Sequence, residues 1–143
     1  MLPAQGAFPL GPTTRRFARR LADTLAGVAG ASHVIVVDDA RSGSVAVGPR
    51  VSSERSLLDV VLPSAATVCP LHRLPASVRA ALHPWAADAV VVVPAVFGND
   101  LVAVGVAPVD ADVPVPLRRL DDEAQRVAAG ITLARLIEAV RAA

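Results

Sequence analysis

The chain has 143 residues, enough for one ordinary domain with a single hydrophobic core. Its 14 basic residues, all Arg, nearly balance 13 acidic residues and leave a formal charge of +1, so no overall field attracts nucleic acid. The longest uncharged apolar run, Ala89 to Phe97, is far shorter than the roughly 18 to 20 residues that cross a membrane. No secretory signal opens the sequence, and one cysteine, Cys69, cannot form an internal disulfide. These features predict a cytoplasmic protein without a membrane segment.

The first part of the chain is predicted to be a flexible leader followed by a helix. Three prolines and two glycines within Met1–Pro12 disfavour regular structure, so residues 13–143 are interpreted as the single folded domain. Thr13 or Thr14 is the expected helix cap, and the glycines at 27 and 30 are expected to end the helix. The apolar positions that recur at helical spacing are Phe17, Leu21, Leu25 and Val28.

A first β-hairpin is predicted directly after this helix. The run from Ser32 to Asp38 is short, rich in β-branched residues and bounded by turn residues, as expected for a buried strand. Residues 38–43 then turn the chain. Val45 and Val47 alternate with smaller residues, as in an antiparallel strand with one buried face, and Val51 is the furthest candidate member of that strand.

The segment Ser52–Ala87 is irregular because prolines divide it into short pieces. Two short helices are predicted in it, over Ser53–Val61 and over Pro75–Leu82. A brief strand is expected between them, over Ala66–Leu71.

A second hairpin and a long helix close the chain. Two β-branched runs, Val90–Val96 and Leu101–Val106, are joined by a turn that contains Gly98 and neighbouring Asn and Asp residues. The final helix is predicted over Leu117–Val140, with acidic residues at 121–123 near the positive end of its dipole. It is apolar on two sides, which predicts two packing partners. The first side carries Leu120, Ala124, Val127, Ile131 and Ala134, and the second carries Leu133, Leu136, Ile137 and Val140.

The order helix, hairpin, irregular segment, hairpin, helix resembles a GAF domain, a small-molecule sensing module common in bacterial signalling proteins. Residues Ala89–Val106, followed by Leu120–Ile131, look like the closing unit of that family: a strand with a central proline, a glycine turn, a strand ending in Gly-Val and an Ala-rich helix with acidic residues near its start. The resemblance implies an α/β (α+β) fold, in which a central antiparallel sheet of about five strands is flanked by the N- and C-terminal helices. A PAS-like fold is the alternative, since it also backs an antiparallel sheet with helices.

The candidate ligand site lies in the irregular segment, which the family resemblance places over the sheet. Imidazole, guanidinium and indole groups there could hold the polar end of a ligand above an apolar floor. The alternative interpretation is a Pro-rich surface loop with a buried thiol and a packed indole. The candidate residues are Cys69, His72, Arg73, His83 and Trp85.

The sequence gives little support for a metal site, a bound cofactor or catalytic residues. Cys69, His72 and His83 lack the fourth ligand and second pair typical of zinc sites. A Cys-Pro pair is a weak signal for haem ligation. Among chemistries known in GAF-like domains, bilin attachment uses Cys followed by His, whereas Pro70 follows Cys69. Methionine sulfoxide reduction needs more than one cysteine, and the cyclic-nucleotide signature needs a Lys. We therefore expect no metal and no catalytic residue, and the cofactor is unknown.

Two further polar features have ordinary structural interpretations. Arg15, Arg16, Arg19 and Arg20 share two helical turns and could contact nucleic acid or an acidic partner, but a solvated helix face is the simpler interpretation. His33, at the start of a predicted strand, is interpreted as a hydrogen-bonded residue of a sheet edge.

Two functions follow from the resemblance. The first is a non-catalytic sensory domain that binds a small molecule and signals through its terminal helices. The second is a ligand-free dimerisation or protein-interaction module. A homodimer through the helices at Phe17–Val28 and Leu120–Val140 is expected, and any signal is expected to pass to a separate partner protein. Membrane and nucleic-acid partners are not expected.

Overall fold

The computed structural model describes residues 10–38, 41–53, 56–57, 62–110 and 112–142, and the structural statements below concern these residues. In chain order the elements are α1 (Pro12–Ala29), β1 (Ser32–Asp38), β2 (Arg41–Val47), β3 (Thr67–Pro70), the 3₁₀ helix η2 (Leu71–Arg73), α2 (Ala76–Leu82), the 3₁₀ helix η3 (His83–Trp85), β4 (Ala89–Phe97), β5 (Asp100–Val109) and α3 (Leu117–Ala142).

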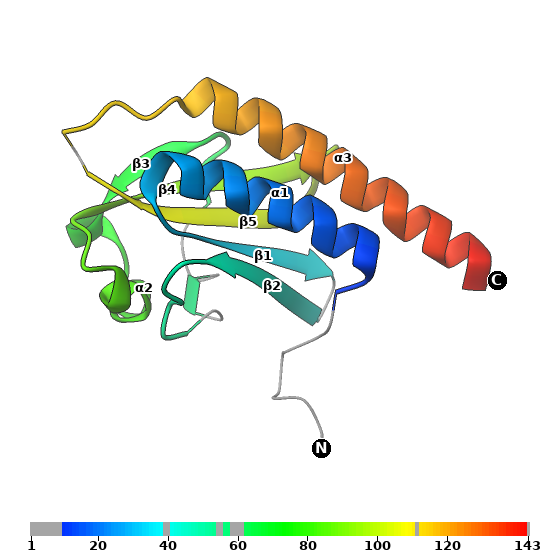
Figure 1. Cartoon of the computed structure of the whole chain (residues 1–143), viewed down its shortest axis with the longest axis horizontal. Coiled ribbons are helices and arrows are strands. Elements are labelled where there is room, and N and C mark those ends of the chain that lie inside the picture. Colours follow the sequence, from blue (N-terminus) through cyan, green and yellow to red (C-terminus); the bar gives the residue numbers. More distant parts are fainter. Residues whose placement is uncertain (1–9, 39–40, 54–55, 58–61, 111, 143) are drawn as a thin grey trace, which may run out of the picture.

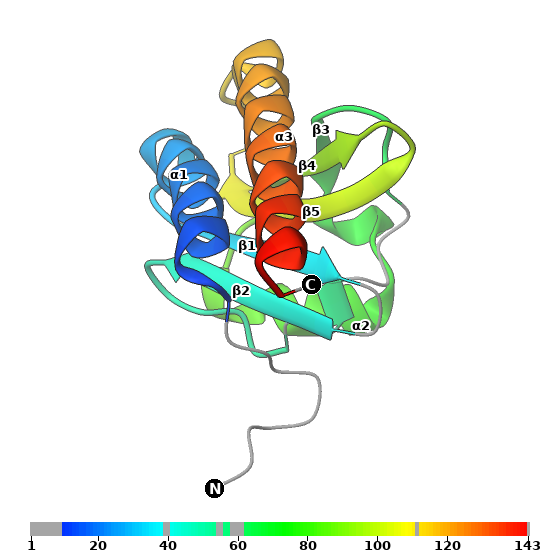
Figure 2. The same ribbon diagram turned by 90° about the vertical axis from the view of Figure 1, so that its right-hand side faces the viewer.

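The five strands form one antiparallel sheet in the order β2-β1-β5-β4-β3. The long helices α1 and α3 lie side by side on one face, and α2 lies on the other (Figures 1 and 2). The last turns of α3 project beyond the sheet in Figure 1. This arrangement confirms the predicted sheet with flanking N- and C-terminal helices.

The first hairpin pairs β1 with β2 from Ser32 opposite Val47 to Asp38 opposite Arg41. The predicted turn was too long, because β2 already begins at Arg41. Strand β1 also pairs with β5 and is therefore an inner strand. The interpretation of His33 as an edge residue is wrong, since His33 lies in this inner strand and is fully buried.

Helix α1 confirms the predicted helix but begins differently. Pro12 is its first residue and Gly11 its N-cap, with no side-chain capping bond, whereas Thr14 is buried inside the helix. A proline suits the first helical position, because a backbone N–H there would have no acceptor within the helix. Gly30 ends the helix in the left-handed conformation with a φ of 84°, as predicted.

The hairpin β4–β5 is longer than the sequence predicted, and its pairing continues to Ala89 opposite Val109. Gly98 supplies a positive φ of 63° at the turn. In the irregular segment, β3 and α2 confirm the predicted strand and second short helix. The predicted helix over Ser53–Val61 lies largely outside the described residues.

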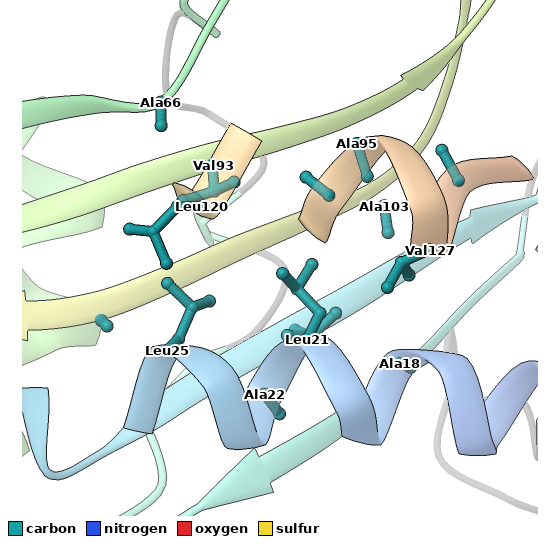
Figure 3. Close-up of a cluster of buried hydrophobic side chains, with 14 of the residues drawn as sticks. Ala18, Leu21, Ala22, Leu25, Ala66, Val93, Ala95, Ala103, Leu120 and Val127 are labelled. Atoms are coloured by element: carbon teal, nitrogen blue, oxygen red, sulfur yellow. The ribbon is translucent and has the colours of Figure 1, made fainter. Parts of the chain in front are cut away.

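Two apolar clusters hold the helices on the sheet. The first fills the space between the sheet and the helix pair α1 and α3, and includes Leu21, Leu25, Val93 and Leu120 (Figure 3). Helix α1 approaches β5 so closely that a Cβ atom on Gly105 would lie 2.6 Å from Leu25 Cδ1. A residue with a side chain at position 105 would therefore force the buried Leu25 side chain to shift.

The second cluster lies on the opposite face of the sheet, where α2 packs against alternate residues of β1, β4 and β5. Ile35, Val78, Leu82 and Val90 are at most 2% exposed. The alternation along β4 sends odd-numbered residues to the first cluster and even-numbered ones to the second, as expected for a strand buried on both faces. The segment where the sequence predicted a ligand site is thus anchored by a second core.

Candidate functional site

A pocket of about 520 Å³ lies beside β3, the edge strand of the sheet, and is here called the β3 pocket. Its volume is within the range of sites for small organic molecules. Its walls come from β3, η2 and the start of α2. The lining residues are Thr67, Val68, Cys69, Pro70, Arg73, Leu74 and Pro75.

The chain turns sharply beside this pocket, which explains how neighbouring residues can line it. The Leu71 N–H donates to the Asp88 carbonyl at 2.9 Å and extends the pairing of β3 with β4 by one bond. Helix η2 then ends when the Leu74 N–H donates to the Leu71 carbonyl. Pro75 follows as the N-cap of α2. Two prolines and a single 3₁₀ turn therefore fold residues 67–75 around the pocket.

The exposed edge of β3 offers little to an added strand. Backbone groups alternate in direction along an antiparallel strand, so residues 66, 68 and 70 face away from β4 when Leu71 faces it. The Ala66 N–H donates to Asp121 Oδ1 of α3 at 2.6 Å, and Pro70 has no N–H. Of residues 66, 68 and 70, only Val68 has an outward-facing N–H that does not donate to Asp121. This edge suits a small ligand better than a peptide that pairs as a β-strand.

Cys69 lies in the wall of the β3 pocket and is half-buried. Desolvation by burial raises the pKa of its thiol above the ordinary value. The neutral thiol is therefore the dominant form at neutral pH, and it presents a weakly polar, polarisable surface to the pocket.

The structure brings together only two of the five predicted site residues in the β3 pocket, Cys69 and Arg73. His72 and His83 are exposed and do not line it. Trp85 packs at the border of the second cluster, and its Nε1 donates to the Pro49 carbonyl at 2.7 Å. Arg73 is thus the one charged side chain in the wall of this pocket.

Asp121 is a functional candidate that the sequence did not identify. Its carboxylate accepts the Ala66 N–H and so joins the start of β3, beside the pocket, to the first turns of α3. The sequence placed Asp121 in an acidic run that favours the positive end of the helix dipole. No local sequence pattern indicates that Asp121 contacts Ala66, which lies 55 positions earlier.

A second hollow of about 340 Å³, here called the hairpin groove, lies between the C-terminal half of α3 and the end of the β4–β5 hairpin. It is lined by Phe97, Asp100, Leu101, Val102, Thr132, Arg135, Leu136 and Ala139. Arg135 Nη2 donates to the Val37 carbonyl at 2.6 Å and fixes this half of α3 to the end of β1.

Next to the hairpin groove, α3 carries an exposed apolar row, here called the α3 stripe. It consists of Leu133, Leu136, Ile137 and Val140, which are 59%, 59%, 44% and 73% exposed. The sequence predicted that α3 has two apolar sides. The first side is buried against the sheet and α1, and the α3 stripe is the second.

The predicted basic face of α1 is partly neutralised by ion pairs. Arg19 Nε lies 3.0 Å from Asp23 Oδ1, and Arg20 Nε lies 2.5 Å from Glu123 Oε1 on α3. Glu123 also lies 3.8 Å from Arg126 Nη1. Arg20 thus helps to hold the two helices together, which favours the structural interpretation of this face over a nucleic-acid site.

Within the described ranges, no three His, Cys, Asp or Glu side chains come together where they could hold a metal ion. Among the described helices, none combines the length and apolarity needed to cross a membrane.

The sheet order, the helix pair on one face and the short helix on the other define a GAF-like fold. Comparison with solved structures agrees. The chain superposes on a domain of a protein assigned as a two-component sensor histidine kinase from Sinorhizobium meliloti 1021 with a TM-score of 0.64 and 14% identity, over 90% of this chain and 97% of that one. It also matches the GAF domain of a two-component sensor histidine kinase from Bacillus halodurans, with a TM-score of 0.59 and 12% identity over 87% of this chain and 97% of that one.

The PixJ GAF domain of Thermosynechococcus elongatus, in its blue-light-absorbing form, gives a TM-score of 0.60 and 12% identity over 94% of this chain and 96% of that one. No family model and no curated protein matches the sequence. The chain therefore has the fold of these GAF domains.

Proposed function

We propose that this chain is a non-catalytic regulatory domain that binds a small molecule in the β3 pocket. The ligand class that fits is a mixed molecule, with an apolar body against Val68 and Leu74 and a polar or anionic end at the Arg73 guanidinium. The thiol of Cys69 is neutral at neutral pH and adds to the weakly polar wall. Its surroundings suit packing against a ligand better than nucleophilic attack on one.

The observation that carries the proposal is the link from the pocket to α3. Ala66 precedes β3 directly, and its N–H is held by Asp121 of α3. A ligand that moves β3 would lengthen or tighten this bond and so act on the long helix. Such a ligand can change the helix only if it binds the two positions of β3 with different affinity.

Native mass spectrometry of the purified chain tests the proposal. The expected result is a mass excess under native conditions that is lost under denaturing conditions. Arg73→Gln should lower the occupied fraction, since a lost charge-assisted hydrogen bond of about 1.5 kcal/mol weakens binding roughly tenfold. Thr67→Trp should lower it as well, because the indole would fill the pocket.

Arg79→Gln is the matched control, because Arg79 is an exposed arginine on α2 outside the pocket lining. It should leave the occupied fraction unchanged. Absence of a mass excess from the folded wild-type protein, or equal loss in the Arg79 and Arg73 variants, would contradict a ligand in the β3 pocket.

Dimerisation is the second candidate function, and the α3 stripe is the observation that favours it. Four large apolar side chains, each at least 44% exposed, lie on one helix in a chain whose other apolar helix positions are largely buried. A patch of this kind on a soluble domain marks a protein contact. The subunit count of the same native spectra tests it, since a monomer at all concentrations would oppose it.

A further inference from the structure

We propose that the hairpin groove is a second ligand site and that it takes a zwitterionic molecule with an apolar side chain, such as a free aliphatic or aromatic amino acid. The carboxylate of the ligand would lie at Arg135 and its ammonium group at Asp100. The hairpin groove and the β3 pocket share no lining residue, so the inference goes beyond the proposed function and does not depend on it.

One wall of the groove comes from a single side of α3. Its residues have the spacing i, i+3, i+4 and i+7, which places them on the same side of a helix. They are Thr132, Arg135, Leu136 and Ala139. The Thr132 hydroxyl donates to the Ala128 carbonyl at 2.8 Å, so its proton is used inside the helix. The Arg135 guanidinium is therefore the charged group that this wall presents to a ligand.

Arg135 is held in position by the protein itself. Its Nη2 atom donates to the Val37 carbonyl at 2.6 Å, and the residue is half-buried. A guanidinium has five N–H donors in a fixed planar arrangement, so one bond to Val37 leaves donors for a carboxylate. A cation that is already positioned loses less side-chain entropy when an anion binds than a mobile one does.

The other wall comes from the end of the β4–β5 hairpin, which lies on the side of α3 that faces away from α1 (Figure 2). Phe97 ends β4 and is 48% exposed, and Asp100 begins β5 opposite it in the register. Leu101 and Val102 continue this wall. The hairpin therefore supplies an apolar surface that carries one negative charge.

Asp100 and Arg135 line the groove from its two walls, yet among the described residues they form no ion pair with each other. Opposite charges that stay apart match a ligand that carries both signs, since each charge then meets its complement. A purely apolar ligand would remove water from both groups without compensation. A simple anion would be attracted by Arg135 and repelled by Asp100. The charge pattern therefore favours a zwitterion.

The size and the apolar lining of the groove define the rest of the ligand. Its volume of about 340 Å³ lies at the lower end of the range for sites of small organic molecules. This volume suits a single amino acid better than a peptide or a nucleotide. The apolar side chain would lie between Phe97 and Leu136. Such a ligand would join α3 to the hairpin, as Arg135 already joins α3 to the end of β1.

A titration of the isotope-labelled chain with L-leucine and with L-phenylalanine, followed by amide chemical shifts, tests the site. Saturable shifts are expected at residues 97–102 and 132–139. Isocaproate and isopentylamine keep the leucine side chain and carry only the carboxylate or only the ammonium group. Each should bind about tenfold more weakly than leucine, because one charge-assisted hydrogen bond is lost.

Asp100→Asn removes the charge from the hairpin wall and keeps the shape of the side chain. It should weaken leucine binding about tenfold and leave isocaproate binding no weaker, because isocaproate has no ammonium group. Asp122→Asn is the matched control, since Asp122 is an exposed aspartate of α3 outside the groove lining, and it should change neither dissociation constant. Ala139→Trp should abolish the shifts, because its indole would fill the groove.

The outcomes separate the two ligand sites. The groove is overturned if neither amino acid gives saturable shifts in the folded wild-type chain, or if the shifts are confined to residues 67–75 of the β3 pocket. Equal weakening by Asp100→Asn and Asp122→Asn also overturns it. Isocaproate binding as tight as that of leucine overturns the zwitterionic ligand. Arg73→Gln should leave the groove shifts unchanged, so failure of the β3 pocket is distinguishable from failure of the groove.

Discussion

The Phe17 ring lies directly over Gly130, at the crossing of α1 and α3. A Cβ atom built on Gly130 would lie 2.4 Å from Phe17 Cε1 and 2.5 Å from Phe17 Cζ. Such distances are too short for carbon atoms, so the aromatic ring occupies the space that any side chain at position 130 would need. Glycine in the middle of a long helix costs stability, and this contact explains why it stands there.

Gly130→Ala is therefore expected to destabilise the chain although alanine favours helices. Overpacking costs about 1–3 kcal/mol, against a gain of up to about 1 kcal/mol from helix propensity. We expect a net loss of about 1 kcal/mol in the free energy of unfolding, measured by urea denaturation.

Gly27→Ala is the control for that variant. Gly27 lies in α1, and a Cβ atom there would meet no other atom within 4 Å. This substitution should stabilise the chain by about 0.5–1 kcal/mol. If both substitutions stabilise the chain, Phe17 can move aside at little cost and the proposed packing role of Gly130 is wrong.

Asp121→Ala is expected to loosen the start of β3. The variant leaves the N–H of the buried Ala66 without the carboxylate that accepts it, at a cost of about 1–3 kcal/mol. Amide hydrogen exchange at residues 66–69 should rise more than exchange in β5. Asp122→Ala, on the exposed neighbouring residue, should change neither quantity. Equal amide exchange rates in the Asp121→Ala and Asp122→Ala variants would contradict a role for Asp121 in holding β3.

The strands were predictable because their local signals are strong. Val90–Val96 and Leu101–Val106 are β-branched runs on either side of a glycine turn, and Gly30 stops α1 where the sequence indicated. The order of strands was not predictable in the same way. The pairing of β1 with β5 joins residues about 70 positions apart, and no local pattern marks β1 as an inner strand. For this reason His33 was assigned to an edge.

The candidate site shows the same limit. Cys69 and Arg73 are four positions apart, so one tight turn brings both to the β3 pocket. His83 and Trp85 follow α2, and the direction of that helix carries them away from the pocket. Asp121 reaches Ala66 only because α3 crosses the sheet near β3. Contacts between residues that are distant in the sequence depend on tertiary packing, so residue spacing does not predict them.

Cys69 should react more slowly with iodoacetamide in the folded chain than in the unfolded chain. Burial raises the pKa of the thiol, so between its unfolded and folded pKa values the folded chain holds less thiolate, which is the reactive form. The rate should therefore rise with pH along a curve displaced to higher pH than the curve measured in urea. Because Cys69 is the single cysteine, the reaction reports on this residue alone. A folded-state curve at lower pH would indicate an activated thiolate and a chemical role for Cys69.

Arg135→Met is expected to free the projecting end of α3. The Arg135 guanidinium donates a hydrogen bond to the Val37 carbonyl at 2.6 Å. This bond connects the C-terminal half of α3 to the end of β1. Methionine keeps most of the aliphatic volume and removes the donor, so the loss should be about 1–3 kcal/mol, typical of a hydrogen bond from a charged group. Arg141→Met, on an exposed arginine in the last turn of the helix, should cost less than about 0.5 kcal/mol.

Because Arg135 fixes the half of α3 that carries the α3 stripe, its loss should weaken the proposed dimer without changing the stripe itself. The measurement is amide exchange over residues 133–142, at a dilution where the protein is monomeric, beside the dimer dissociation constant. Faster exchange together with a raised dissociation constant would mean that the stripe must be held in place by the sheet before it can bind a second copy. Unchanged exchange would show that the helix end is ordered by its own backbone hydrogen bonds, and the bond from Arg135 to Val37 would then be dispensable.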